Sequence, residues 1–483
     1  RKTILKHLVD LTRSKVEISM ANNRKKSARI TLVECIDVKE WRGMENSLEI
    51  ILQRTEWFRQ ARFGMFIHFG LYAIPGRGEW IRSNEKMTIE DYQPYFDAFN
   101  PSEFDAKVWA KAAKEAGMKY VVLTAKHHDG FCLFDSEYTD YKITNTPFGR
   151  DLVREFVEAV RAEGLRVGLY FSLLDWYHPD YPKFSDRHHP MRGNIAYKDE
   201  QIDFDRYLEF MHHQVEEIVT KYGKLDILWF DFSYGEMFGE KWKASDLIEL
   251  VRKHQPDVVV DNRLETSGEG FGSIATEEIH SYSGDFVSPE QILPHEGIRN
   301  YKGELLPWEL CLTMNNHWAY NPSDKQFKSS KVLIRKLVEC VSKGGNMILN
   351  VGPNAKGSFP QESIDILREI GCWMKSNGES IYEGELVNLP KPEWGYYTKN
   401  GKILYAHVFE QPIGPIALTG IDKEQIERMS FVHDGSEVRI SNSWTTLAFQ
   451  DICFAQYGEI GAYTYPLPDE VDSVIKIELK EEI

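Results

Sequence analysis

Short apolar runs alternate with longer amphipathic stretches from residue 56 to about residue 376. The short runs are rich in β-branched and aromatic residues, as strands are, and the longer stretches repeat their apolar residues at helical spacing. We expect strands at 64–70, 120–127, 166–173, 225–232, 257–263, 272–278, 307–314 and 346–353. We expect helices at 103–116, 151–163, 201–222, 244–254, 329–343 and 361–377. Gly117, Gly164 and Gly223 follow three of these helices, as glycines do at helix ends.

Eight strands that alternate with helices predict an α/β fold, a TIM-like (β/α)8 barrel whose active site lies at the carboxyl ends of the strands. After about residue 383 the pattern changes to period-two alternation, at 402–409, 437–442, 444–449 and 473–479. Alternation without long helices predicts a small C-terminal β-sandwich. We therefore expect a basic leader or peripheral segment at 1–43, a catalytic barrel at 44–382 and a β-sandwich domain at 383–483.

Composition narrows the choice of partners and compartment. Lys and Arg number 58 against 74 Asp and Glu, so the formal charge is −16, and we expect neither nucleic acid nor a membrane as partner. The six cysteines form no CxxC pair, which argues against a zinc ribbon and a dense disulfide framework. The chain has no apolar run of about 18 residues and no signal-like start. We expect a cytoplasmic protein, unless an export signal preceded residue 1.

Polar side chains that can bind a sugar stand at the ends of the expected strands. His68 ends the first strand, His127 and His128 end the second, Asp231 ends the fourth and Arg263 ends the fifth. Tryptophans fall in or beside the same loops, at Trp80, Trp176, Trp229 and Trp318. Aromatic faces with polar groups around them suit the C–H groups and hydroxyls of a carbohydrate. The strand ends therefore predict a carbohydrate site.

The run His127-His128-Asp129 contains residue types that ligate metals, so a metal-dependent hydrolase has to be considered. Adjacent residues of a strand point to opposite faces, so the two histidines of a regular strand do not ligate one ion. The chain also contains no HxH or HExxH motif. We therefore expect neither a catalytic metal nor another cofactor.

Asp231 is the strongest catalytic candidate, because it ends the run Leu225-Asp226-Ile227-Leu228-Trp229-Phe230-Asp231, in which four apolar residues lead directly to this carboxylate. A carboxylate at the catalytic face can attack an anomeric carbon when a second carboxyl group protonates the leaving oxygen. Candidates for the second group are Glu265, Glu269, Glu277, Glu278, Glu290 and Glu309. Spacing alone does not choose among them, although Pro289 stiffens the loop that carries Glu290.

Several motifs occur in order along the expected strands. The earlier ones are Trp57-Phe58, Arg62-Phe63-Gly64-Met65-Phe66-Ile67-His68-Phe69-Gly70, Gly78-Glu79-Trp80 and Leu123-Thr124-Ala125-Lys126-His127-His128-Asp129-Gly130-Phe131. The later ones are Asp175-Trp176, Leu228-Trp229-Phe230-Asp231, Trp308-Glu309, Trp318-Ala319-Tyr320, Gly345-Asn346 and Leu349-Asn350-Val351-Gly352-Pro353. Over roughly two thirds of the chain, these motifs resemble the α-L-fucosidases of glycoside hydrolase family 29.

The resemblance implies a retaining exo-α-L-fucosidase with Asp231 as the nucleophile. It implies substrate-binding roles for His68, Glu79, Trp80, His127, His128, Tyr170, Trp229, Arg263 and Trp318. Where many members have Tyr-Tyr-Ser, this chain has Tyr170-Phe171-Ser172, so the pocket hydroxyl comes from Tyr170 or is missing. The Ser-Pro-Glu that ends at Glu290 resembles a Thr-Pro-Glu of part of the family, which favours Glu290 as the acid/base over Glu277 and Glu278.

Two other functions stay open on the sequence. A non-catalytic barrel that binds fucose or other glycans would keep the aromatic and histidine residues, although the presence of Asp231 argues against it. A different glycosidase, such as an α-galactosidase, would act on another aryl glycoside. For the fucosidase we expect a fucosylated oligosaccharide or glycoconjugate as substrate, and the oligomeric state, including a homo-oligomer, is open.

Overall fold

Seven parallel strands form the sheet that carries the site, in the order β5-β4-β3-β2-β1-β7-β6. The computed structural model describes residues 47–458 and 465–483, so the segment expected at 1–43 lies outside the described residues. The strands are β1 Phe63–Ile67, β2 Tyr120–Lys126, β3 Arg166–Ser172, β4 Ile227–Asp231, β5 Val259–Val260, β6 Glu309–Thr313 and β7 Asn346–Val351. Nearly every residue in them is buried, because helices cover a parallel sheet of this kind.

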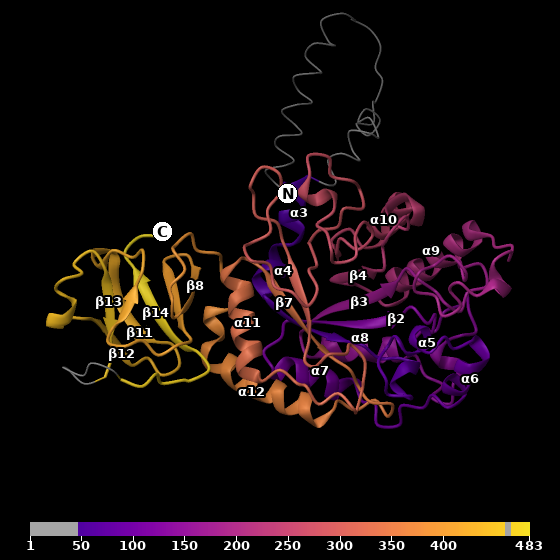
Figure 1. Ribbon diagram of the computed structural model, residues 1–483, viewed down its shortest axis with the longest axis horizontal. Helices are drawn as coiled ribbons and strands as arrows, with labels where there is room; N and C mark the ends of the chain where they lie inside the picture. Colours follow the sequence, from indigo (N-terminus) through magenta and orange to yellow (C-terminus); the bar gives the residue numbers. More distant parts are fainter. Residues whose placement is uncertain (1–46, 459–464) are drawn as a thin grey trace, which may run out of the picture. The chain divides into compact units, whose positions relative to one another are not determined.

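Helices follow the strands and surround the curled sheet (Figure 1). The longer ones are α7 Ala106–Glu115, α8 Leu152–Ala162, α9 Phe204–Lys221, α10 Ala244–His254, α11 Ser330–Ser342 and α12 Gln361–Asn377, which confirms the six expected helices. Shorter ones are α3 Leu48–Arg54, α4 Glu56–Ala61, α5 Ile81–Asn84 and α6 Ile89–Asp97. None of the helices in the described part of the chain is both long enough and apolar enough to cross a membrane.

Helix α8 shows how the sequence sets these boundaries. The Asp151 carboxylate accepts a hydrogen bond from the Arg154 amide at 3.0 Å and so caps the first turn. Apolar residues at helical spacing, among them Phe156 and Val160, are buried against the sheet. Gly164, with φ +71°, follows the end of the helix, where a side chain would be strained.

The strand expected at 272–278 is wrong. The structure has a short 3-10 helix there, η5 Ser273–Ala275, in place of a strand. The Glu265 carboxylate accepts a hydrogen bond from the Ser273 amide at 2.6 Å, and Gly272 before it has φ +75°. A capped turn that begins at a glycine with positive φ does not form a strand.

Residues 286–290 supply the sixth parallel segment of the barrel instead, between β5 and β6. Isolated parallel bridges join Phe286 to Asp261, just after β5, and Glu290 to Cys311 of β6. Gly284 allows this segment to reach the sheet, because its φ is +79° and a Cβ there would lie 2.2 Å from the Asp261 carbonyl oxygen. The ring of parallel segments is therefore completed next to Glu290.

The C-terminal part forms a second, antiparallel sheet of order β10-β13-β12-β11-β14-β9-β8. Its strands are β8 Gly395–Asn400, β9 Ile403–Val408, β10 Ile416–Leu418, β11 Ile426–Phe431, β12 Glu437–Ile440, β13 Cys453–Gln456 and β14 Ser473–Leu479. Leu418 of β10 and Leu404 of β9 come from distant strands in this order but share one apolar core. The sheet therefore folds over on itself, as the two layers of a sandwich do.

Three of the four strands expected in this part are present, as β9, β12 and β14. The strand expected at 444–449 is wrong, because the residues begin with the 3-10 helix η8 Trp444–Thr446. The Ser443 hydroxyl accepts a hydrogen bond from the Thr445 amide and caps this helix. The boundary expected at residue 383 stays a prediction.

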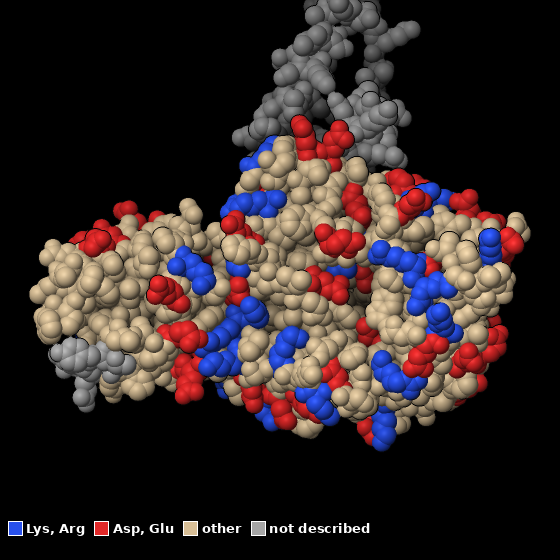
Figure 2. Space-filling model, viewed as in Figure 1, with Lys and Arg blue, Asp and Glu red and all other residues tan. Residues whose placement is uncertain are grey.

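Basic and acidic side chains are interspersed over the face seen in Figure 2.

Candidate active site

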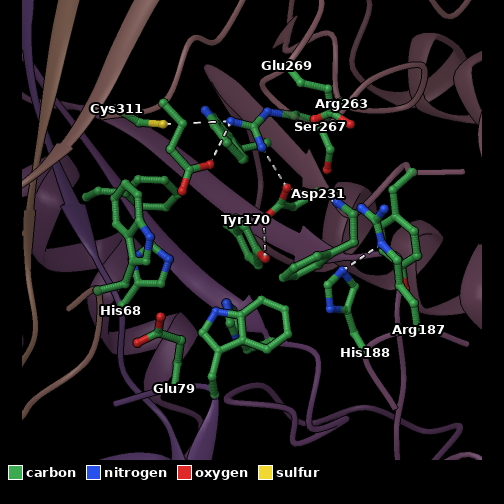
Figure 3. Close-up of a pocket in the computed structure, with 18 residues that line it drawn as sticks. His68, Glu79, Tyr170, Arg187, His188, Asp231, Arg263, Ser267, Glu269 and Cys311 are labelled. Carbon is green, nitrogen blue, oxygen red and sulfur yellow. Dashed lines mark hydrogen bonds and ion pairs between the residues drawn. The ribbon is translucent and has the colours of Figure 1, made fainter. Parts of the chain in front are cut away.

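A cavity of about 190 Å³ lies at the carboxyl ends of the parallel strands. It is lined by Phe66, His68, Glu79, Trp80, His127, Tyr170, Arg187, His188, Trp229, Asp231, Phe232, Tyr234, Arg263, Ser267, Glu269, Glu290, Cys311 and Trp318. Figure 3 shows these side chains converging from several strands and loops. Ten of the eleven site residues expected from the sequence line the cavity, and His128 does not.

His128 lies behind the cavity wall, fully buried. Its ring stacks on Trp176 with centroids 4.0 Å apart and packs against Trp80 at 4.7 Å. Burial lowers the pKa of His128 well below its ordinary value, so the ring is neutral. In this structure, His128 therefore supports Trp80 rather than facing the cavity.

Asp231 stands at the end of β4 with both carboxylate oxygens engaged. Oδ2 accepts a hydrogen bond from the Tyr170 hydroxyl at 3.0 Å, and Oδ1 accepts from Nη1 of Arg263 at 3.0 Å. The Phe232 amide also donates to Oδ1, at 2.9 Å, from a backbone with φ +81°, which side chains rarely adopt. The hydroxyl in doubt from the sequence is therefore that of Tyr170, and it holds the carboxylate.

The electrostatics of Asp231 combine opposing effects. Burial raises the pKa of its carboxyl, the positive charge of Arg263 lowers it, and the nearby Glu290 carboxylate raises it, so that the pKa is about 6. The group is therefore ionised above pH 6 but takes up a proton more readily than an exposed aspartate.

Arg263 joins the two candidate carboxylates. Its Nη1 contacts Asp231, and its Nη2 donates to Glu290 Oε2 at 3.2 Å. Ser288 fixes the guanidinium from behind, because its hydroxyl accepts from Nε at 2.8 Å and its carbonyl accepts from Nη2 at 3.0 Å. Burial lowers the pKa of Arg263, but the charges of Asp231 and Glu290 raise it by more, so its pKa lies above the ordinary value and the group stays charged. One rigid cation therefore holds both carboxylates on one side of the cavity.

The other glutamates considered from the sequence differ in position. Glu265 bonds to the Ser273 amide and to His280. Glu309 begins β6, at the opposite end of the strands, where it bonds to Tyr120. Glu277 and Glu278 are exposed and do not line the cavity. Only Glu269 and Glu290 of the six candidates line it, and only Glu290 bonds to Arg263.

The remaining wall combines polar groups with an apolar face. Glu79 accepts a hydrogen bond from the Ala319 amide at 3.0 Å, and burial raises the pKa of Glu79. Phe66 packs against Trp229 at 5.3 Å and Trp318 at 6.1 Å, which forms an aromatic corner. A ligand with both hydroxyls and an apolar substituent fits such a wall.

Six lining residues were not proposed from the sequence: Arg187, His188, Phe232, Tyr234, Ser267 and Cys311. Two of them, Arg187 and His188, are polar neighbours in one loop. Arg187 donates from Nε to Nε2 of His188 at 2.9 Å and lies over the Tyr234 ring at 4.2 Å. The two residues belong to the long connection between β3 and α9, which has no regular polar pattern from which a site could be inferred. The adjacent basic and aromatic residues Arg187-His188-His189 were the one available signal.

Comparison with known proteins gives consistent matches. The model of the α-L-fucosidase family matches residues 38–379. An α-L-fucosidase from Dictyostelium discoideum is 30% identical over 74% of this chain and 78% of its own length, and plasma α-L-fucosidase from Rattus norvegicus is 31% identical over the same shares.

Solved structures agree with this fold. α-L-Fucosidase isoenzyme 1 from Paenibacillus thiaminolyticus is 54% identical, covers 89% of this chain and 100% of its own, and has a TM-score of 0.86. A family 29 α-L-fucosidase from Bacteroides thetaiotaomicron is 31% identical, with a TM-score of 0.73 over 89% of this chain and 96% of its own. That protein was trapped as a covalent intermediate with 2-fluoro-fucosyl fluoride, in a variant with glutamine in place of a glutamate.

Proposed function

The chain belongs to the α-L-fucosidase family, and from that premise we propose that Asp231 and Glu290 carry out its double-displacement hydrolysis of terminal α-linked L-fucose. It is a glycoside hydrolase, a retaining α-L-fucosidase. Family membership favours neither a non-catalytic barrel nor an α-galactosidase. The observation that carries the proposal is the shared guanidinium of Arg263, which bonds to both carboxylates.

In the first step, Asp231 attacks the anomeric carbon while Glu290 gives its proton to the glycosidic oxygen. The bond to the leaving group breaks, and a fucosyl ester forms on Asp231. In the second step, Glu290 takes a proton from water as the water attacks the anomeric carbon, which frees Asp231 and releases L-fucose with retained configuration. This mechanism needs the two carboxyl groups roughly 5–5.5 Å apart, and a common cation holds such a pair close together.

The binding roles follow from the cavity wall. His68, Glu79, Trp80 and His127 would hold the fucose hydroxyls, while Tyr170 and Arg263 orient Asp231. The apolar corner made by Phe66, Trp229 and Trp318 would receive the methyl group of this 6-deoxy sugar. A cavity of about 190 Å³ has room for one sugar ring, which supports exo action.

Hydrolysis of 4-nitrophenyl α-L-fucoside, measured beside 4-nitrophenyl α-L-galactoside, which differs from it only by a hydroxyl on C6, tests the function. We expect kcat/KM for the galactoside to be lower by about 100-fold, because its additional hydroxyl would enter the apolar corner without a partner. Comparable turnover of the two glycosides would contradict the placement of the methyl group. Galactoside turnover without fucoside turnover would contradict the function itself.

The activity should fall on the acidic side as Asp231 takes up a proton. Its pKa is about 6, and only the ionised carboxylate attacks, so kcat/KM should fall about tenfold per pH unit well below pH 6. The measurement is kcat/KM for the 4-nitrophenyl fucoside from pH 4 to pH 8, with thermal unfolding at each pH as the control. A flat profile down to pH 4 would contradict the raised pKa.

We further propose fucosylated oligosaccharides or glycoconjugates as the natural substrates. The solved relatives include a bacterial fucosidase with an iminocyclitol inhibitor. We also propose that the protein is located in a reducing compartment such as the cytoplasm. The free thiols of Cys132, Cys311, Cys340 and Cys453 support this location. The homo-oligomer considered from the sequence stays a prediction.

A further inference from the structure

Asn350, near the carboxyl end of β7, connects His68 to the backbone of Trp318. The amide nitrogen of Asn350 donates to the Trp318 carbonyl oxygen at 2.6 Å, and Oδ1 of Asn350 lies 2.7 Å from Nδ1 of His68. Asn350 is 3% exposed and His68 is 5% exposed, so water does not compete for these hydrogen bonds.

Only one arrangement of protons satisfies these two contacts. A carbonyl oxygen accepts but cannot donate, so the NH2 group of Asn350 must face Trp318 and its oxygen must face His68. The amide oxygen also only accepts, so Nδ1 of His68 carries a proton. Burial lowers the pKa of His68 to about 3, although the bond to Asn350 opposes this, so the ring is neutral. A neutral ring with a proton on Nδ1 has none on Nε2.

We propose that Asn350 is a positioning residue that presents Nε2 of His68 to the fucose ring as a hydrogen-bond acceptor. The inference rests on the proposed function, which places His68 on a fucose hydroxyl. His68 lines the cavity (Figure 3), and its Nε2 has no hydrogen-bond partner among the described residues. The hydroxyl that meets His68 must therefore donate its proton, and a group that only accepts is rejected at this point.

The groups around His68 do not change its protonation near neutral pH, so Nε2 stays a hydrogen-bond acceptor. The rings that pack against it belong to Phe66, His127, Tyr170 and Trp318. Burial lowers the pKa of His127 and raises that of Tyr170, each well away from 7, so both rings stay neutral. Glu79 is on the same side of the cavity, and as a carboxylate it accepts hydrogen bonds as well. The wall therefore prefers hydroxyls that donate.

The first test compares product inhibition by L-fucose with inhibition by its monodeoxy and monodeoxyfluoro analogues. A hydroxyl donates, whereas carbon-bound fluorine can only accept. A His68→Phe variant identifies the fucose hydroxyl that binds His68. For that hydroxyl, the deoxy analogue inhibits the variant as well as L-fucose does, although it inhibits the wild type more weakly than L-fucose. At that position we expect the deoxy and fluoro analogues to inhibit the wild type equally poorly, each about tenfold more weakly than L-fucose. A fluoro analogue that inhibits as well as L-fucose would overturn the proposal.

The second test changes Asn350 itself. In Asn350→Asp the new carboxylate would stabilise a protonated His68, so Nε2 would become a donor and the fluoro analogue should inhibit at least about threefold more strongly than the deoxy analogue. The same variant should gain an ionisation in its pH profile for kcat/KM, at about pH 6–8, that the wild type lacks. Asn350→Leu should raise the inhibition constant of L-fucose about tenfold and show no new ionisation.

Asn346→Asp is the matched control, because Asn346 is a buried asparagine of the same strand that bonds to the Phe58 carbonyl at the other end of the barrel. We expect its pH profile and its preference between analogues to match those of the wild type. If Asn350→Asp loses activity but keeps the wild-type profile and preference, Asn350 has only a structural role and the inference is wrong. Failure of the wild type to cleave the fucoside would instead contradict the proposed function, so the two failures are distinguishable.

Discussion

Replacing Asp231 with alanine should lower kcat for the 4-nitrophenyl fucoside by about four orders of magnitude, because this variant removes the carboxylate that attacks the anomeric carbon. Azide restores part of the turnover by entering the space that the carboxylate leaves. It attacks the α-fucoside directly, so the product is β-L-fucosyl azide. The rate and the configuration of the adduct, measured by absorbance and by NMR, check this expectation.

Asp226→Ala is the control for this variant. Asp226 precedes β4 at the opposite end of the same strand, where it pairs with Arg166 at 2.9 Å and accepts from the Val167 amide at 3.0 Å. Its replacement should cost stability but leave kcat per folded molecule within about twofold of the wild type. If Asp231→Ala keeps substantial activity without azide, Asp231 is not the nucleophile.

The barrel geometry explains why most of the site could be predicted from the sequence. Parallel strands bring their carboxyl ends to one face, so strand-end residues as distant as His68, Asp231 and Arg263 had to lie close together. The residues of the β3–α9 connection lack this constraint. Arg187 and His188 reach the cavity through a long irregular loop, and no periodic pattern indicates where such a loop leads.

The wrong sixth strand has a related cause. The short run at 272–278 was one of eight expected strands, but a strand also needs a partner for its backbone, and a capped turn satisfied that backbone locally. The segment that completes the barrel, 286–290, contains Pro289 and pairs only through isolated bridges. A short segment that pairs through so few backbone hydrogen bonds has no long run of strand-forming residues from which a strand could be predicted. Glu290 was nevertheless favoured, although it was assigned to a loop and not to the edge of the barrel.

Replacing Glu290 with alanine should slow the enzyme to a degree that depends on the leaving group. A natural glycan leaves as a basic alkoxide and needs a proton from the enzyme, so kcat/KM should fall by about 10³–10⁴. 4-Nitrophenolate leaves without that proton, so kcat/KM for the aryl fucoside should fall only about tenfold. The fucosyl ester on Asp231 should then accumulate, because no base activates water. A burst of 4-nitrophenol and the intact mass of the fucosylated protein would show it.

Glu269→Ala is the matched control, since Glu269 lines the same cavity but does not bond to Arg263. It should show neither the burst nor the dependence on the leaving group, and the appearance of both in this variant would transfer the acid/base role to Glu269.

Azide distinguishes the two catalytic carboxylates by stereochemistry. In Glu290→Ala the ester on Asp231 still forms, with the β configuration, and azide displaces it from the opposite face to give α-L-fucosyl azide. In Asp231→Ala no ester forms, and a single displacement gives the β product. The two variants should therefore yield opposite anomers from the same substrate. Loss of a nucleophile gives the β azide, and loss of an acid/base gives the α azide. The same anomer from both variants would therefore contradict the roles of Asp231 and Glu290, even if each variant had lost activity.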